Sequence, residues 1–330
     1  MPKPLVIHIG VDASPLILER QALAGIDCDI ESVALGHSGS VIEAIREADV
    51  VLNNHFAVTQ EIFRQLKRCR LMVRYGHGYD TIDVKAATDC GVMITNIAGS
   101  TTEEVANHAL MLLLALAREV RRLDAATRSG RWDEVYSRTV GRRIVGETAG
   151  IVGFGFIGRA MARKCRSLGM NVLVYDPYVG DWWALEYGVE LTGLERLLED
   201  SDYVSIHCPL SAATRHLIDE DALGMMKNDA YLINTARGPI VKETALISAL
   251  QSGAIAGAGL DVFENEPLAP DHPLLGMENV VVTPHIAGSS EIGWEIIQRR
   301  AGEEAARVLN GGRPNVLVNP EVVGRLASSK

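Results

Sequence analysis

Short apolar runs alternate with amphipathic segments along most of the chain, and this alternation is the first guide to its fold. In about the first hundred residues, four apolar runs have the length and β-branched content of buried strands: LVIHIGV (5–11), DVVLNN (49–54), LMVRYG (71–76) and GVMITN (91–96). Between them, three segments space their apolar residues as one face of a helix does: 40–48, 59–69 and 83–90. Strands separated by helices are typical of parallel sheets that helices cover, so the pattern predicts an α/β fold.

Residues 100–130 interrupt this alternation with one continuous helical pattern, and either Ser100 or Thr101 is suited to cap the start of that helix. A second series of strands and helices follows. A final helix at about 290–309 then precedes a polar tail. A chain of 330 residues is long enough for two domains, and this order predicts two Rossmann-like domains, each a doubly wound parallel sheet, with one inserted into the other.

The composition and net charge of the chain disfavour some classes of binding partner. The chain is 47% hydrophobic and carries a formal net charge of −10 without a basic block. Such a chain is a poor candidate for binding nucleic acid or an anionic membrane. An anionic substrate would therefore have to be held by local cations or by backbone amides.

The cysteines and the most apolar stretch predict a cytoplasmic location. Five cysteines, an odd number without CxxC spacing, favour reduced thiols. The amino terminus lacks the charged region and long apolar run of a secretory signal. The stretch from Val105 to Ala117 is too short to span a bilayer and contains Asn107 and His108, so we expect a buried helix there.

The strongest local motif is GFGFIG, in which Gly153, Gly155 and Gly158 form GxGxxG between a predicted strand and a predicted helix. In this setting Gly153 permits the tight turn, Gly155 lets a pyrophosphate approach the backbone, and Gly158 lets the helix lie close to the strand. The next predicted strand ends at Asp176, whose carboxylate would accept hydrogen bonds from ribose hydroxyls and repel a 2′-phosphate. This predicts NAD rather than NADP. The alternative is that the glycines serve close packing only and Asp176 caps a turn.

Three further ionisable side chains follow predicted strands: Arg237 after AYLIN, Glu266 after GAGL, and His285 after VVV. In open α/β sheets, ligands bind at the carboxyl ends of the strands. His285 would supply the proton that hydride transfer to a ketone requires, with Glu266, or as second choice Glu264, orienting its ring. Arg237 would hold a carboxylate through paired hydrogen bonds. The alternatives are a solvated or capping histidine and an arginine in a surface turn.

The other histidines receive less specific predictions. His207 also ends a predicted strand, and we expect its backbone to line the nicotinamide or adenosine pocket. No set of histidine, cysteine and carboxylate has metal-ligand spacing, so no metal is predicted, and no serine sits in a G-x-S-x-G elbow. The remaining histidines are predicted to be structural or exposed to solvent: His8, His37, His108, His216 and His272.

Five stretches, in this order, resemble the successive signatures of the D-isomer-specific 2-hydroxyacid dehydrogenases: VGFGFIGRAMARKCRSLGMNVLVYDPY, CPLSAATRHLID, LINTARGPIV, GAGLDVFENEP and VVVTPHIAG. The stretch RYGHGYDTIDVKAAT resembles their substrate-domain loop. The resemblance implies a discontinuous substrate domain of residues 1–101 and 290–330, an NAD-binding domain of residues 102–289, an active-site cleft between the two, and a homodimer. It further implies hydride transfer between NAD(H) and a small 2-keto or D-2-hydroxy acid, most closely glyoxylate or hydroxypyruvate.

The resemblance also assigns roles to residues by position. Arg237 matches the substrate-binding arginine, Glu266 the catalytic carboxylate, and His285 the acid/base. The cofactor contacts that it implies are Gly153, Gly155, Phe156, Ile157, Gly158, Asp176, His207, Cys208, Pro209, Thr214, Thr235, Ala236, Asp261, His285 and Gly288.

The substrate loop departs from the family pattern at one position. Gly76, His77 and Gly78 match the segment whose backbone amides grip the substrate carboxylate, so His77 and Gly78 are predicted substrate contacts. Family members more often carry a small or aliphatic residue in place of His77. Its imidazole would either donate to a second polar group of the substrate or point to solvent. Residues 53–56 are predicted to set the side-chain preference: Asn53, Asn54, His55 and Phe56.

Two alternative functions remain open. VRYGHGYDTIDVKAAT and YDPY also resemble the carboxy-terminal-binding-protein corepressors, scaffolds that would use NAD to control assembly. The aromatic residue that those proteins carry shortly after the active-site histidine is absent here, and Gly288 occupies that region. Phosphite oxidation would keep the same three side chains. A regulated phosphoglycerate dehydrogenase is disfavoured because the chain ends soon after the last substrate-domain segment, whereas Glu266 argues against formate oxidation.

Overall fold

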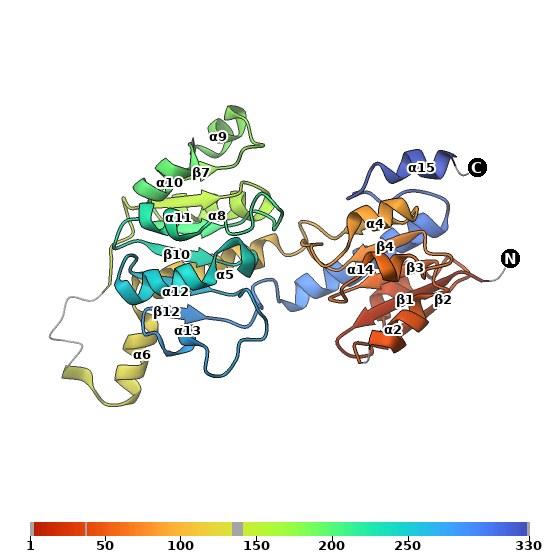
Figure 1. Cartoon of the computed structure of the whole chain (residues 1–330), viewed down its shortest axis with the longest axis horizontal. Helices are drawn as coiled ribbons and strands as arrows, with labels where there is room; N and C mark the ends of the chain where they lie inside the picture. Colours follow the sequence, from red (N-terminus) through yellow and green to blue (C-terminus); the bar gives the residue numbers. More distant parts are fainter. Residues whose placement is uncertain (1–2, 37, 134–140, 329–330) are drawn as a thin grey trace. The chain divides into compact units, whose positions relative to one another are not determined.

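The computed structural model describes residues 3–36, 38–133 and 141–328, so His37 lies outside the described residues. Contacts between Cα atoms divide the chain into two compact units. Unit 1 comprises Met1–Thr101 with Ser290–Lys330, and unit 2 comprises Thr102–Ser289. Each unit is built on one parallel sheet with helices on both faces, which confirms the predicted α/β class (Figure 1).

Unit 1 contains a five-stranded sheet in the order β2-β1-β3-β4-β5. Its strands are β1 (Leu5–Gly10), β2 (Asp29–Ala34), β3 (Val50–Asn53), β4 (Leu71–Arg74) and β5 (Met93–Asn96). Its helices are α1 (Ile17–Ala22), α2 (Ser38–Ile45), α3 (Gln60–Phe63), α4 (Val84–Asp89), α14 (Glu291–Leu309) and α15 (Val322–Ser328). Side chains of α2, α3 and α4 cover one face, and those of α14, with Leu16 and Leu23 on either side of α1, cover the other. Because β3 and β4 are buried along their whole length, they show as uninterrupted apolar runs in the sequence.

Two parts of unit 1 differ from the predictions. The apolar pattern misses β2 because this edge strand buries only Ile30, so DIESVA contains no continuous apolar run. The predicted polar tail is wrong, since Asn319 and Val322 are fully buried. Asn319 Oδ1 accepts a hydrogen bond from Ile94 N (2.8 Å), and Nδ2 donates to Val92 O (2.9 Å). One buried amide therefore ties this segment to β5.

Unit 2 contains a seven-stranded sheet in the order β12-β11-β10-β9-β6-β7-β8. Its strands are β6 (Thr148–Val152), β7 (Asn171–Tyr175), β8 (Glu190–Leu191), β9 (Tyr203–Ile206), β10 (Tyr231–Asn234), β11 (Gly257–Leu260) and β12 (Val280–Val282). Its helices are α5 (Thr102–Ala117), α6 (Val120–Arg128), α8 (Phe156–Ser167), α9 (Asp181–Tyr187), α10 (Leu194–Asp200), α11 (Glu220–Met225), α12 (Glu243–Ser252) and α13 (Pro273–Gly276). Side chains of α5 and α8 pack on one face, and those of α10, α11 and α12 on the other. The strand order reverses between β6 and β9, which makes their carboxyl ends the expected place for a ligand.

The single long helix predicted for residues 100–130 is two helices, α5 and α6. Glu119 separates them with a left-handed backbone (φ 49°), and its Oε1 accepts a hydrogen bond from Gly141 N (3.2 Å). No glycine or proline marks the break, so the apolar spacing continues through it. Ser100 does not cap α5, since its hydroxyl donates to Ile97 O (2.8 Å). Thr101 directly precedes α5.

The apolar stretch of α5 packs against the sheet as predicted, with Val105, Ala109 and Leu112 buried. None of the helices in the described ranges is long and apolar enough to cross a membrane. The five cysteines are free thiols, of which Cys69 and Cys165 are buried, whereas Cys90 is exposed.

Candidate active site

The glycine turn lies where β6 meets α8. Gly153 has a positive φ of 94°, and a Cβ there would come within 2.5 Å of Cys208 N. At Gly158 a Cβ would overlap the carbonyl of Gly153, whereas at Gly155 it would meet no described atom within 4 Å. Packing therefore requires glycine at the first and third positions, while Gly155 leaves open space above the turn. Open space is what a pyrophosphate needs to approach the backbone, so the turn fits a dinucleotide.

The first turn of α8 and Asp176 flank that space. The N–H groups of the first turn, including those of Phe156 and Ile157, have no intrahelical partner and suit a phosphate group. Asp176 Oδ2 accepts a hydrogen bond from Phe154 N (2.8 Å), and Oδ1 accepts one from Tyr178 N (2.9 Å). Asp176 thus caps this turn, as the alternative held. Its carboxylate oxygens keep further lone pairs for ribose hydroxyls.

The segment after β9 lies against the glycine turn. His207 N donates to Val152 O (2.7 Å), which brings Cys208 against Gly153. His207 Nε2 lies 2.8 Å from Ser205 Oγ, and burial lowers the pKa of His207 to about 3, so this imidazole is neutral. Thr214 Oγ1 donates a hydrogen bond to the carbonyl of Pro209 (2.6 Å), which closes the turn that follows Cys208. Of the predicted cofactor contacts of this segment, His207 and Cys208 therefore lie beside the glycine turn.

The turn after β10 presents Arg237. Asn234 Oδ1 accepts from Ala236 N (3.0 Å), and Asn234 Nδ2 donates to Arg237 O (2.9 Å), so one side chain fixes the turn. A Cβ on Gly238 would overlap the backbone of Phe263, which shows how closely this turn approaches the one after β11. Thr235 is 8% exposed, and its buried hydroxyl has no hydrogen-bond partner among the described residues. An unpartnered buried hydroxyl at this edge fits a polar group of a bound ligand.

Glu266 and His285 form a close pair, with Oε2 of the carboxylate 2.6 Å from Nδ1 of the imidazole. Glu266 Oε1 also accepts a hydrogen bond from Phe263 N (2.9 Å). Burial acts to raise the pKa of Glu266, but the hydrogen bond with His285, the one from Phe263 and the charge of Arg237 together lower it. An ionised Glu266 fixes a hydrogen on Nδ1 and leaves Nε2 of His285 for other chemistry.

The second-choice carboxylate, Glu264, has other partners. Its Oε1 lies 2.9 Å from His216 Nε2 and accepts a hydrogen bond from Glu243 N (3.2 Å). Asp261 is fully buried, and its carboxylate accepts hydrogen bonds from the two amides after His285, those of Ile286 (3.0 Å) and Ala287 (2.9 Å). The next residue, Gly288, lies in the same turn. The contact of Asp261 and Gly288 with the cofactor stays a prediction.

In unit 1, the loop Gly76–Gly78 follows β4. His77 Nε2 accepts a hydrogen bond from Gly99 N (2.9 Å), and its carbonyl accepts one from Asn96 Nδ2 (2.6 Å). Its Nδ1 lies 3.5 Å from Thr101 Oγ1. The ring is therefore turned toward its own chain, an arrangement that neither predicted alternative included. The approach of this loop to a substrate stays a prediction.

The strand ends of unit 1 add one candidate site residue, Arg74, and reduce the number of accessible residues in the segment 53–56. Asn53 and Phe56 are buried and bond each other, with Asn53 Nδ2 donating to Phe56 O (2.8 Å), so Asn54 and His55 are the more accessible members of that segment. Arg74 is a residue that the sequence analysis missed. It ends β4, is 7% exposed, and donates to Tyr75 O through Nη1. Arg237 is predicted as a site residue because it follows an apolar strand. The strand LMVR likewise ends in an arginine, Arg74, so the same pattern could have identified it.

Within the described ranges, no group of three or more histidine, cysteine, aspartate or glutamate side chains is arranged to hold a metal ion. The arrangement instead combines a dinucleotide-type turn with an imidazole, a carboxylate and a guanidinium at one edge of one sheet.

Comparison with known proteins agrees with this description. Residues 110–287 match the family model "D-isomer specific 2-hydroxyacid dehydrogenase, NAD binding domain". A glyoxylate reductase of Korarchaeum cryptofilum is 42% identical over 286 residues, which cover 86% of this chain and 86% of that protein. A D-3-phosphoglycerate dehydrogenase of Archaeoglobus fulgidus is 39% identical, and the match covers 75% of this chain but 47% of that protein.

A solved structure has a similar fold over nearly the whole chain. The crystal structure of a glyoxylate reductase from Paecilomyes thermophila has a TM-score of 0.88 at 29% sequence identity, covering 97% of this chain and 99% of that one.

Proposed function

Because the chain belongs to the D-isomer-specific 2-hydroxyacid dehydrogenase family, we propose that it catalyses the NAD-dependent reduction of glyoxylate and of other small 2-keto acids, including hydroxypyruvate. It is an oxidoreductase with a Rossmann-type cofactor domain in unit 2. The observation that carries the proposal is the 2.6 Å pair of Glu266 and His285 at the same sheet edge as the glycine turn.

The proposed chemistry assigns one task to each side chain. Arg237 binds the substrate carboxylate and draws charge toward the carbonyl oxygen. His285 gives a proton from Nε2 to that oxygen as the carbonyl carbon receives a hydride, and Glu266 stabilises the orientation of the ring through Nδ1. The bound nicotinamide supplies the hydride. The product is a 2-hydroxy acid, and His285 regains its proton from solvent.

The contacts of His77 support a role for unit 1 in holding the substrate. Its bonds to Gly99 N and Asn96 Nδ2 fix the loop whose Gly78 amide is the proposed carboxylate contact. His77 is thus proposed to shape the loop rather than to donate to the substrate. His77→Val would lose the acceptor for Gly99 N, whereas His77→Gln would retain one. We expect a higher KM for glyoxylate in the first variant and a value near that of the wild type in the second.

The proposal is tested by following NADH absorbance with glyoxylate, hydroxypyruvate, pyruvate and 3-phosphohydroxypyruvate. We expect turnover with glyoxylate and hydroxypyruvate, and lower efficiency with NADPH because of Asp176. Arg237→Ala should lower kcat/KM by about 10²–10³-fold while NADH binding stays within about twofold. The control is Arg237→Lys, which keeps the charge but not the planar pair of donors. No turnover with any of the four acids would instead favour a scaffold of the corepressor type.

A second candidate substrate class is the 3-phosphorylated acid. D-3-phosphoglycerate dehydrogenases of Archaeoglobus fulgidus and Methanocaldococcus jannaschii are 39% and 36% identical to the chain. The match covers 47% and 53% of those proteins, so this class has less support than glyoxylate reduction. Preferential turnover of 3-phosphohydroxypyruvate would reverse the order.

We also propose a cytoplasmic homodimer. The five free thiols support the compartment. Exposed apolar side chains on α5 and α6, Met111 (41% exposed) and Val120 (51% exposed), support an association surface. Light scattering of the purified protein tests the dimer, and a mass of one chain would contradict it.

A further inference from the structure

Three side chains from separate elements of unit 2 form a hydrogen-bonded chain next to the turn that carries His285. His108 comes from α5, Thr283 follows β12, and Asp261 follows β11. Thr283 Oγ1 lies 2.5 Å from Asp261 Oδ1, and His108 Nε2 lies 2.8 Å from Thr283 Oγ1. An ionised carboxylate has no hydrogen to donate, so the threonine hydroxyl donates to Asp261. That hydroxyl has a single hydrogen, and His108 must therefore donate to it from Nε2.

Asp261 holds the His285 turn from both sides. Its carboxylate accepts hydrogen bonds from the Thr283 hydroxyl, which precedes the histidine, and from the amides of Ile286 and Ala287, which follow it. Its main-chain carbonyl accepts the N–H of His285 itself (2.8 Å). Contacts from a single residue thus fix positions 283, 285, 286 and 287. The side chain of Asp261 is 1% exposed, and charge-assisted bonds to a carboxylate so far from water are strong.

The turn needs such support because His285 has a left-handed backbone, with φ 55°. A residue with a side chain is strained in this region and keeps the conformation only where its surroundings fix it. The side chain that results is the one that meets Glu266 at 2.6 Å. A change in the Asp261 contacts would therefore move the imidazole relative to its carboxylate partner.

We propose that Thr283 and His108 are positioning residues for the proton transfer. They orient the Asp261 carboxylate, which in turn holds the His285 turn in its left-handed conformation. This inference rests on the proposed function, in which His285 is the acid. It gives His108, predicted from the sequence to be structural or exposed, a role in catalysis through two other residues rather than through substrate or cofactor.

The test compares Thr283→Val with Thr283→Ser. Valine has the shape of threonine without the hydroxyl, so it removes one donor to Asp261 and the nearer acceptor of His108 Nε2, which also lies 3.5 Å from Asp261 Oδ1. We expect kcat for glyoxylate to fall by about 10- to 100-fold, because small displacements of an acid from its target have effects of this size. The KM for glyoxylate and the dissociation constant of NADH should stay within about twofold. Serine should restore kcat to within about threefold of the wild type.

His108→Leu and His108→Gln form a second pair that does not change the His285 turn in sequence. Leucine removes the donor, whereas the glutamine amide can donate to Thr283, so only the leucine variant should lose kcat. A Thr283→Val enzyme with wild-type kcat would overturn the proposal. So would equal losses in the valine and serine variants. A lower midpoint of thermal unfolding with unchanged kcat would also show a purely structural role.

Hydrogen exchange separates this inference from the proposed function. In Thr283→Val we expect the peptide covering 284–289 to exchange at least tenfold faster, because Ile286 and Ala287 donate to the carboxylate that Thr283 orients. Unchanged exchange would overturn the anchoring whether or not the enzyme is active. Absence of keto-acid turnover by the wild type, together with faster exchange in the variant, would contradict the proposed function and leave the anchoring established.

Discussion

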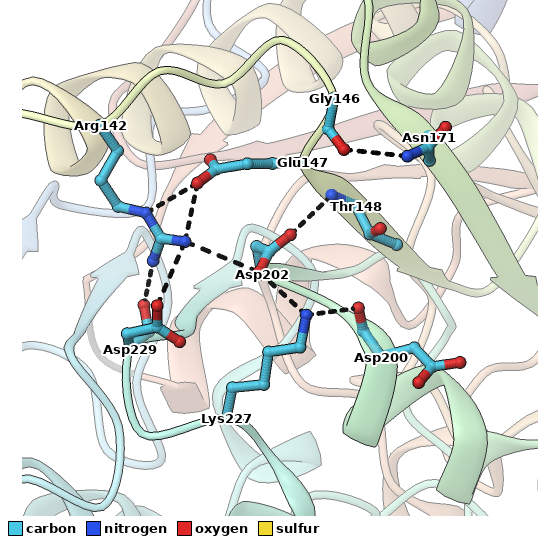
Figure 2. A network of polar contacts seen from close by, with 9 residues as sticks. All are labelled: Arg142, Gly146, Glu147, Thr148, Asn171, Asp200, Asp202, Lys227 and Asp229. Carbon is cyan, nitrogen blue, oxygen red and sulfur yellow. Dashed lines mark hydrogen bonds and ion pairs between the residues drawn. The ribbon is translucent and has the colours of Figure 1, made fainter.

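The strands of the unit 2 sheet start at one side, here called the amino edge, and end at the other, here called the carboxyl edge. Both edges carry an arginine among carboxylates, but the side chains at the two edges differ in their partners and in their exposure to solvent. At the amino edge, Arg142 donates to Glu147 Oε1 (2.9 Å from Nε) and lies 3.6 Å from Asp202 and 3.4 Å from Asp229 (Figure 2). The Asp202 carboxylate in turn accepts hydrogen bonds from Lys227 Nζ (3.0 Å) and from Thr148 N (2.8 Å). The charges at this edge thus satisfy one another.

At the carboxyl edge the network is more open. The side chains of Glu266 and His285 are 34% and 42% exposed, against 19% and 14% for Glu147 and Asp202. Nδ1 of His285 is held by Glu266, while Nε2 has no partner among the described residues. The same kinds of side chain thus fix the strand starts at one edge and leave Nε2 of His285 accessible at the other. We therefore expect mutations at the carboxyl edge to lower activity with little change in stability, and mutations at the amino edge to lower stability with little change in activity.

His285→Ala is the largest expected effect on activity. Loss of a general acid lowers turnover by about 10²–10⁴-fold, and the exposed position of the ring predicts little change in stability. The measurement is kcat/KM for glyoxylate alongside the midpoint of thermal unfolding. Turnover within tenfold of the wild type at neutral pH would remove the acid role.

Arg142→Ala is the converse change. It leaves Glu147 and Asp202 without their shared cation and removes a guanidinium that lies 5.7 Å from the ring centroid of Tyr203 and 5.8 Å from that of Tyr231. Breaking a buried ion pair costs about 3–5 kcal/mol, and the 23% exposure of Arg142 points to the lower end. We expect the free energy of unfolding in urea to fall by about 3 kcal/mol, with kcat within twofold of the wild type.

Arg142→Lys is the matched control for this prediction. It keeps the charge but loses the planar group that contacts three carboxylates and two rings, so we expect a smaller loss than with alanine. A stability equal to that of the wild type in both variants, or a tenfold loss of kcat in either, would contradict the division between the two edges.

The sequence predicts the carboxyl edge better than the links between distant segments. Gly153 and Gly155 lie in a local motif, and Arg237 directly follows an apolar strand, so their positions follow from neighbouring residues. His108 and Thr283 are 175 positions apart, and no local pattern relates them. Their contact depends on α5 packing against the sheet, which only the folded chain supplies.

Backbone features were the other part that the sequence did not reveal. The left-handed residue Glu119, which lies between α5 and α6, is neither glycine nor asparagine, so no residue type signals the break. Asn319 lies in a polar-looking tail, and its burial follows from backbone groups of β5 that need hydrogen-bond partners.

The smallest expected effect concerns His207. This residue lies at the carboxyl edge, but its imidazole is buried and bonded to Ser205, as the charged side chains of the amino edge are bonded to one another. Burial lowers its pKa to about 3, below the value of 6.5 expected in the unfolded chain. The unfolded state therefore takes up a proton below pH 6.5 while the folded state does not, so stability is full above pH 6.5 and is lost as the pH falls toward 3. One such group contributes about 1.4 kcal/mol of loss for each pH unit between 6.5 and 3.

His207→Gln removes this titration, so the midpoint of thermal unfolding should fall less between pH 7 and pH 5 in the variant than in the wild type. Calorimetry at the two pH values makes the comparison. The same slope in the His207 variant and the wild type would mean that this imidazole is protonated in the folded chain, and the carboxyl edge would then carry a second ionisable histidine beside the glycine turn.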